Sequence, residues 1–276
     1  MQINPRIPDF NFRNKSALIT GGTRGIGLET GLGLGSYGAN CILTYSWGDH
    51  DEDEIITRFR EAGAPVPLLV QADVISKDDT RNLLEKIGEK YDSVDIFISN
   101  VSVAQAVRTF EDYSLKALKK TISYSTWPLV NYLKMIREKF NEYPDYVIGI
   151  SSPGPDYYIH NYDFVAASKG LLEIFSKYLA YRLRDQGTNI NIVRSSLVRT
   201  ESFGMIIGKE FSGFMEKYGI SDDIWIEPKE VADVVTALCS GYCDAINGQT
   251  ITVDRGTTFF SNIMKIYSNH VQSAQV

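Results

Sequence analysis

A serine, a tyrosine and a lysine follow one another within residues 150–169, which read ISSPGPDYYIHNYDFVAASK. Tyr162 and Lys169 are seven residues apart. At ~3.6 residues per turn this is close to two turns, so a helix covering both would present them on one face. An ammonium beside a phenol favours the phenolate and would lower the phenol pKa from roughly 10 towards working pH. We therefore predict a catalytic site of Ser152, Tyr162 and Lys169, in which Tyr162 donates a proton or binds an oxyanion. The alternative is that Tyr162 and Lys169 only cap and solvate a helix.

A glycine-rich turn, TGGTRGIG, lies between an apolar run and a segment whose apolar residues have helical spacing. At such a junction glycines let the backbone approach a dinucleotide pyrophosphate, and the helix N-terminus supplies amides and positive potential. The turn is thus predicted to bind a dinucleotide cofactor through Gly21, Thr23, Arg24, Gly25, Ile26 and Gly27.

The end of the second expected strand, at Tyr45 and Ser46, indicates which cofactor is used. An NAD site typically places a carboxylate about 20 residues after the glycine turn, but here no carboxylate follows the strand end at Tyr45 and Ser46 until Asp49. A guanidinium such as that of Arg24 attracts the 2′-phosphate of NADP, which a carboxylate would repel. These residues favour NADP(H) over NAD(H). The alternative is that Arg24 only solvates the turn, and Trp47 stands where a second basic residue would have strengthened the preference.

Short β-branched runs alternate with longer helical patterns along the chain. The pattern predicts strands over residues 16–20, 38–45, 65–71, 94–99, 146–151, 189–194 and 249–254. It predicts helices over residues 26–37, 77–90, 111–120, 124–140, 164–184 and 228–239, with another after the acidic run 49–54. This alternation is typical of an α/β doubly wound Rossmann fold, a seven-stranded parallel sheet with helices on both faces.

The length of 276 residues suits one domain spanning residues 1–276. We expect an N-terminal arm at 1–13, a mobile apolar substrate lid at 201–227, and a tail or oligomer contact at 261–276.

The net charge of −6 argues against a nucleic-acid partner, and three cysteines without further metal ligands are expected to be reduced thiols. No run approaches ~18 apolar residues and no secretory signal is present, so we expect a cytoplasmic protein without a membrane partner.

Together these motifs make residues 15–256 similar to the short-chain dehydrogenase/reductase family. Thr20 and the glycines of the turn match the family's TGxxxGxG motif. The resemblance adds further cofactor-binding residues, namely Asp73 and Val74 at the adenine, Asn100 in SNVS, Lys169, and Thr200 near the nicotinamide carboxamide. Departures from the family pattern are Ser195 and Ser196 in place of Pro-Gly and Arg255 in place of a glycine in GQTITVDRG.

The active-site positions depart further from most of the family. Val165 occupies the position four before Lys169 where most members carry the tyrosine, and Tyr124 aligns with the family's helix asparagine. The spacing of Tyr162 and Lys169 instead resembles the divergent Y-x6-K branch that contains enoyl-acyl-carrier-protein reductases. By this resemblance Lys169 would bind the nicotinamide ribose, and Tyr162 would stabilise the enolate oxygen of a reduced enoyl thioester. Ser152 would assist Tyr162 or only shape the pocket.

Two other side chains near the site, Tyr158 and His160, could also serve as pocket groups. The alternatives are a structural phenol and an exposed loop histidine.

The resemblance implies an NAD(P)H-dependent oxidoreductase of fatty acid or polyketide biosynthesis. It would reduce the C=C bond of an enoyl thioester carried by acyl carrier protein or coenzyme A. The alternatives are a carbonyl/alcohol oxidoreductase, such as a 3-oxoacyl thioester reductase, and a non-catalytic cofactor-binding scaffold. A homodimer or homotetramer formed through residues 124–140 and 163–184 is expected by analogy with the family.

Overall fold

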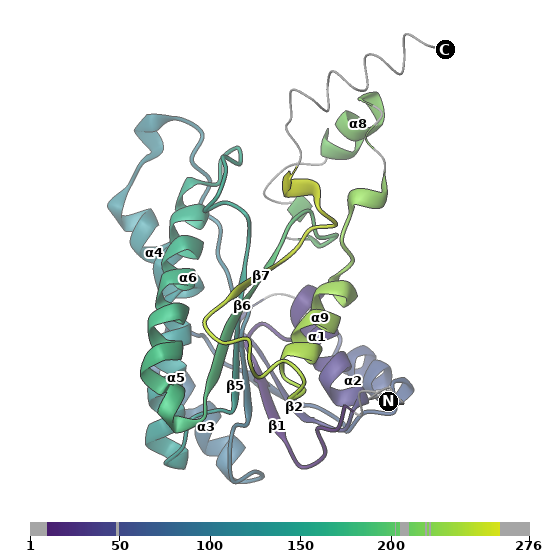
Figure 1. Ribbon diagram of the computed structural model, residues 1–276, viewed down its shortest axis with the longest axis vertical. Coiled ribbons are helices and arrows are strands. Elements are labelled where there is room, and N and C mark those ends of the chain that lie inside the picture. The colour runs from purple at the N-terminus through teal and green to yellow at the C-terminus, as the bar shows by residue number, and fades with distance from the viewer. Residues whose placement is uncertain are drawn as a thin grey trace, which may run out of the picture.

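A seven-stranded parallel sheet forms the centre of the molecule (Figure 1). The computed structural model describes residues 10–47, 50–201, 203–204, 210–218, 220 and 222–259. In chain order the strands are β1 Ser16–Ile19, β2 Asn40–Tyr45, β3 Leu68–Gln71, β4 Ile96–Ser99, β5 Tyr146–Ser151, β6 Asn189–Ser195 and β7 Thr250–Val253. Their order in the sheet is β3-β2-β1-β4-β5-β6-β7. The chain moves outward in one direction from β1 to β3 and in the other direction from β4 to β7, as in a doubly wound fold.

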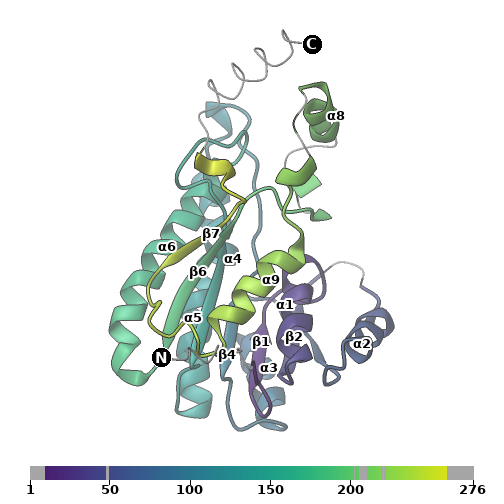
Figure 2. The same ribbon diagram turned by 45° about the vertical axis from the view of Figure 1, so that its right-hand side comes forward.

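Helices cover both faces of this sheet. One face carries α1 Gly25–Ser36, α2 Glu52–Glu61 and α9 Pro228–Leu238, and Figure 2 shows α1 and α9 lying side by side. The other face carries α3 Lys77–Gly88, α4 Leu115–Ser125, α5 Trp127–Phe140 and α6 Asp163–Leu183. Strands buried between two helical layers are mostly apolar, and β1 and β4 are buried at every position. The fold predicted from the alternating pattern is confirmed.

Local chemistry explains where the elements begin and end. β3 is shorter than the expected 65–71 because Pro65 and Pro67 lack the amide hydrogens that a sheet ladder requires. Asp51 caps α2 by accepting a hydrogen bond from the Glu54 amide at 3.1 Å. Pro128 lies in the first turn of α5, where a missing amide hydrogen costs nothing.

Residues 111–120 do not form the single helix that was expected. The segment Phe110–Asp112 is a short 3₁₀ turn, η1, and α4 begins only after Ser114, whose hydroxyl accepts from the Ala117 amide. The expected lid at 201–227 includes α8 Glu210–Lys217 and the 3₁₀ turn Asp222–Ile224. Part of the lid, most of the arm and the tail lie outside the described residues.

Three further expectations concern thiols, metals and membranes. All three cysteines are free thiols, with Cys41 and Cys239 buried and Cys243 half-buried. In the described ranges no cluster of three metal-ligating side chains occurs. The helices within those ranges are too short or too polar to cross a membrane.

Candidate active site

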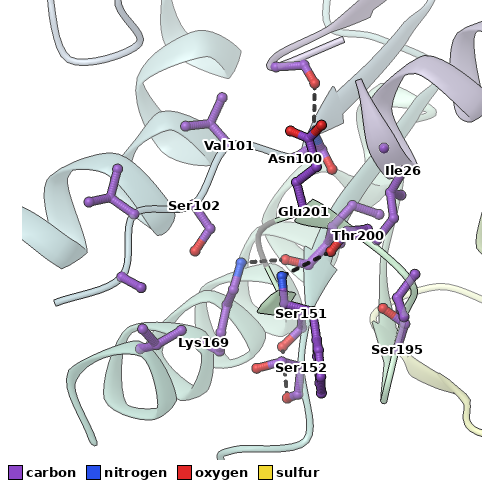
Figure 3. A pocket seen from close by; sticks show the side chains of 18 of the residues that line it. Ile26, Asn100, Val101, Ser102, Ser151, Ser152, Lys169, Ser195, Thr200 and Glu201 are labelled. Carbon is purple, nitrogen blue, oxygen red and sulfur yellow. Dashed lines mark hydrogen bonds between the residues drawn. The ribbon is translucent and has the colours of Figure 1, made fainter. Parts of the chain in front are cut away.

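A cavity of about 1210 Å³ opens at the carboxyl ends of the strands, where ligands bind in open parallel sheets (Figure 3). It is lined by the glycine turn after β1, the ends of β2, β4, β5 and β6, and the start of α6. Of all the predicted catalytic and cofactor-binding residues, only Gly27 does not line it. Two groups of residues far apart in the sequence therefore share one cavity.

Tyr162, Ser152 and Lys169 meet at one wall of the cavity. The Tyr162 hydroxyl donates a hydrogen bond to Ser152 Oγ at 3.1 Å. The Lys169 ammonium is buried and donates to the Ile150 carbonyl at 2.7 Å, beside the strand end that carries Ser152 (Figure 3). The helix predicted over 164–184 is α6, Asp163–Leu183, and Tyr162 lies just outside it as the N-cap residue. The two side chains nevertheless line the same cavity.

Burial sets the protonation of both groups. Loss of hydration lowers the pKa of Lys169 from its usual value to about 8, against the opposing charge of Glu173. Burial raises the pKa of Tyr162, which the hydrogen bond with Ser152 partly offsets. The predicted lowering of the Tyr162 pKa by Lys169 is therefore wrong, because the phenol faces Ser152 and the ammonium binds a carbonyl. A protonated phenol remains available as a hydrogen-bond donor.

A left-handed residue directs Tyr162 into the cavity. Asn161 has φ +60°, a conformation that asparagine tolerates better than most residues. The Tyr162 amide closes a turn by donating to the Ile159 carbonyl at 3.2 Å, and the Asn161 carbonyl accepts from the Val107 amide at 3.3 Å. Within the described chain the buried Asn161 Oδ1 makes no hydrogen bond, so the backbone conformation is the feature that this residue contributes.

Substitutions at Asn161 are expected to separate backbone conformation from side-chain chemistry. Asn161→Gly keeps the left-handed turn and should retain turnover close to wild type. Asn161→Val, whose branched side chain opposes positive φ, should lose about 1–3 kcal/mol of unfolding free energy. By displacing Tyr162 it should also lower kcat by about 10-fold or more. Denaturant unfolding and steady-state kinetics measure the two effects, and equal kcat values for both variants would contradict this role.

The glycine turn forms a cradle that fits a dinucleotide pyrophosphate. Gly21 and Gly25 have positive φ values of 64° and 54°. A Cβ atom on Gly27 would lie 2.3 Å from the Gly21 carbonyl oxygen, so no side chain fits there. Asn100 holds the turn from β4 by donating through Nδ2 to the carbonyls of Thr20 and Gly21, both at 3.0 Å.

The N-terminus of α1 faces this cradle without a side-chain cap. The residue before α1, Arg24, makes no capping hydrogen bond, and the first turn contains no acid. The first amides of a helix have no partner within the helix and carry positive potential, so they suit a phosphate. Together with the glycine cradle, the residues present fit a dinucleotide.

The expected adenine end of the cavity holds an aromatic pair that sequence reasoning did not assign to it. The Tyr124 hydroxyl donates to Asp73 Oδ2 at 3.1 Å, and the exposed Trp47 contacts the Tyr124 ring edge to face, with ring centroids 5.5 Å apart. Tyr124, which aligns with the family's helix asparagine, therefore points towards Asp73. The neighbouring Ser125 hydroxyl shares a 3.0 Å hydrogen bond with Ser102.

Apolar side chains from the described part of the lid line another side of the cavity. They are Phe203, Phe211, Met215, Ile220 and Ile224. Phe203 and Phe211 both pack on Trp225, with ring centroids 4.9 and 5.8 Å away. An apolar wall of this kind suits an acyl group.

The additional candidates Tyr158 and His160 are more exposed than Ser152, Tyr162 and Lys169. Tyr158 lines the cavity but is 79% exposed, and its hydroxyl lies 3.5 Å from Nδ1 of the exposed His160. The geometry agrees with an exposed loop histidine. Sequence reasoning missed the neighbouring Tyr157, which lines the cavity and whose pKa is raised by burial. The cluster of tyrosines in DYYIHNY was the available signal.

Comparisons with known proteins agree with this geometry. The sequence model of the family described as "Enoyl-(Acyl carrier protein) reductase" matches residues 21–258. The 1-cyclohexenylcarbonyl-CoA reductase of Streptomyces collinus is 25% identical over 248 residues, covering 88% of this chain and 87% of that protein. A 3-oxoacyl-(acyl-carrier-protein) reductase of Synechocystis is 26% identical over 259 residues, covering 88% of this chain and 97% of that protein.

A solved structure shows the same fold. The short chain dehydrogenase of Burkholderia cenocepacia J2315 in complex with NADP superimposes with a TM-score of 0.77 at 22% identity, covering 90% of this chain and 99% of that chain. The family match spans far more than half of this sequence, and the alternative of a non-catalytic scaffold is set aside. The chain belongs to the short-chain dehydrogenase/reductase family and is an NAD(P)-dependent oxidoreductase.

Proposed function

We propose that this oxidoreductase reduces the C=C bond of an enoyl thioester carried by acyl carrier protein or coenzyme A, with NADP(H) as cofactor. The observation that carries the proposal is the hydrogen bond from the Tyr162 hydroxyl to Ser152 at 3.1 Å, in a cavity that also contains the buried Lys169. Val165, which occupies the tyrosine position of most family members, is buried and has no hydroxyl. Tyr162 is then the phenol that serves the reaction.

The cofactor-binding part of the cavity is built by the residues around the glycine turn and the strand ends. When bound, the dinucleotide supplies a hydride for the β-carbon of the conjugated thioester. Its pyrophosphate would rest on the turn and the α1 amides, its adenine near Asp73 and Val74, and its nicotinamide near Thr200. The remaining contacts would come from Thr23, Arg24, Ile26, Tyr45, Ser46, Asn100 and Lys169.

Tyr162 would stabilise the charge that develops on the substrate. As the β-carbon is reduced, negative charge builds up on the thioester oxygen, and a hydrogen-bond donor preorganised at that point lowers the barrier. Burial raises the Tyr162 pKa, so the phenol keeps its proton at neutral pH and can donate. Ser152 would hold the phenol in this orientation. Lys169 would bind the ribose hydroxyls and add positive charge nearby.

A second candidate is reduction of a 3-oxoacyl thioester, the reaction named for the Synechocystis relative. The same Tyr162 hydroxyl could protonate an alkoxide instead of holding an enolate. The Y-x6-K spacing and the description of the matching family both support the enoyl reaction.

A turnover comparison separates the two reactions. Oxidation of NADPH, followed at 340 nm, is expected with crotonyl-coenzyme A and not with acetoacetyl-coenzyme A. The reverse pattern would reject the enoyl proposal. Repeating the active assay with NADH tests the cofactor preference. This preference rests on Arg24, which here pairs with the exposed Glu201 at 3.5 Å and could turn to a 2′-phosphate.

We also propose a homodimer or homotetramer. Three large apolar side chains project from α6 into solvent, namely Ile174, Tyr178 and Tyr181. Exposed apolar groups on one long helix suit a helix from a second copy. Sedimentation at several concentrations measures the assembly.

A further inference from the structure

A buried ion pair lies behind the proposed catalytic residues. Arg194 on β6 and Glu173 on α6 are 9% and 7% exposed. The guanidinium binds both carboxylate oxygens, through Nε at 3.1 Å and Nη2 at 2.6 Å. Burying two charges carries a large desolvation cost, and an apolar pair of similar volume is often as stable or more stable. The pair therefore calls for an explanation other than fold stability.

Both partners are connected to the segment that carries Ser152. Glu173 accepts a 2.6 Å hydrogen bond from the Ser151 hydroxyl, at the end of β5. Arg194 pairs through Nη1 with Asp156, in the turn that follows Ser152. The backbone on either side of Ser152 is thus attached to the same ion pair.

Glu173 also lies one helical turn beyond Lys169, a spacing at which two helix side chains are neighbours. Lys169 is buried, and its hydrogen bond goes to the neutral Ile150 carbonyl. Glu173 is the charge that raises the Lys169 pKa against the effect of burial. Several elements packed around Lys169 bring titratable or charged groups near the site. These groups are Glu173 on α6, Arg194 on β6, Tyr124 on α4, and Asp156, Tyr157 and Tyr162 in the loop that precedes α6.

We propose that Glu173 and Arg194 are positioning residues for the Ser152, Tyr162 and Lys169 site. Their ion pair fixes the strand end that presents Ser152, and the carboxylate of Glu173 keeps the Lys169 ammonium charged for its ribose contact. Arg194 weakens the effect of Glu173 on Lys169, because its positive charge partly offsets the negative charge of the carboxylate. The inference rests on the proposed role of Lys169 in cofactor binding and not on the choice of acyl substrate.

The pH dependence of NADPH binding tests this inference, followed by the fluorescence of the bound cofactor between pH 6 and 10. Binding that uses the ammonium should weaken as the pH rises through the Lys169 pKa, which burial lowers to about 8. Glu173→Gln removes the negative charge and leaves Arg194, so the pH at which binding weakens should fall by about 1 unit. Arg194→Gln leaves the carboxylate unbalanced and should shift this pH upward by a similar amount.

Opposite shifts distinguish electrostatic positioning from simple loss of structure, which would weaken binding in both variants without moving the midpoints apart. Shifts in the same direction, unshifted midpoints, or a wild-type profile without weakening near pH 8 would each overturn the inference. If Glu173→Gln does not fold, Glu173→Asp keeps the charge and should leave the midpoint within about 0.3 unit of wild type. A displaced midpoint in that variant would also overturn it.

Asp156→Asn is the matched control. It removes only the outer partner, whose side chain is 58% exposed, and leaves the buried pair in place. Its midpoint should stay at the wild-type pH, and a shift as large as that of Glu173→Gln would overturn the assignment to the buried pair. The binding assay needs no acyl substrate. Wild-type protein that shows the profile but does not reduce crotonyl-coenzyme A would reject the proposed function and leave this inference standing.

Discussion

Tyr162→Phe is expected to lower kcat for the enoyl thioester by about 10²- to 10³-fold, the loss typical of removing one donor to a developing oxyanion. The phenylalanine ring can occupy the same buried space, so the loss would come from the hydroxyl that now donates to Ser152. NADPH affinity and unfolding free energy should change little. Steady-state kinetics, cofactor titration and denaturant unfolding measure the three quantities.

The control for this experiment is Tyr158→Phe, which removes a phenol hydroxyl from the same loop at a position that is 79% exposed. Surface substitutions usually change free energies by less than about 0.5 kcal/mol, so its kcat should stay within about twofold of wild type. A Tyr162→Phe enzyme that keeps kcat within the same range would show that another group stabilises the charge.

Gly27→Ala is expected to weaken cofactor binding strongly. The added methyl group would lie 2.3 Å from the Gly21 carbonyl oxygen and 2.8 Å from Asn100 Nδ2, so the turn that cradles the pyrophosphate has to move. Overpacking of this kind typically costs about 1–3 kcal/mol of stability. NADPH affinity should fall by about 100-fold or more, since both the turn and the α1 amides shift from their positions under the phosphates. Cofactor fluorescence titration and thermal unfolding measure the two losses.

Gly170→Ala provides the matched control, because Gly170 also lies within a helix. Its nearest neighbour outside that helix, a Pro155 side-chain atom, would be 3.8 Å from the new Cβ, an ordinary contact. Alanine in a helix interior is favoured over glycine by about 1 kcal/mol, so this variant should bind NADPH normally and unfold at the same or higher denaturant concentration. Equal NADPH affinities for the two variants would contradict the cradle.

The arrangement of strands and helices could be predicted because its signals are local. Buried parallel strands are short apolar runs, and TGGTRGIG marks a turn in which a side chain at Gly27 would not fit. The other predicted cofactor residues follow the carboxyl ends of neighbouring strands. Because the strands are parallel, these ends lie at one edge of the sheet, and the residues line one cavity.

Other features depend on contacts between distant segments. The spacing of Tyr162 and Lys169 predicted that both side chains face one pocket, but it did not predict the left-handed Asn161 that places Tyr162 at the N-cap of α6. The direction of the Tyr162 pKa shift depends on burial and on Ser152, neither of which helical spacing reports.

The ion pair between Glu173 and Arg194 joins a helix and a strand 21 residues apart, so no short-range pattern indicates it. Its one sequence signal is an arginine inside the strand NINIVRS, which is buried at every position, so an unpaired charge there could not be accommodated. Such a residue predicts that an acidic partner exists without identifying it. The packing of α6 on β6 identifies that partner as Glu173.

The burial of two of the three thiols has a practical consequence for labelling this chain. Alkylating reagents attack thiolates, and burial raises the pKa of Cys41 to about 12 and that of Cys239 as well, so both are shielded and protonated. Cys243 is half-buried, lies after α9 and does not line the cavity. A maleimide dye should therefore attach to the native sequence at that single position, giving a spectroscopic reporter without any engineered cysteine.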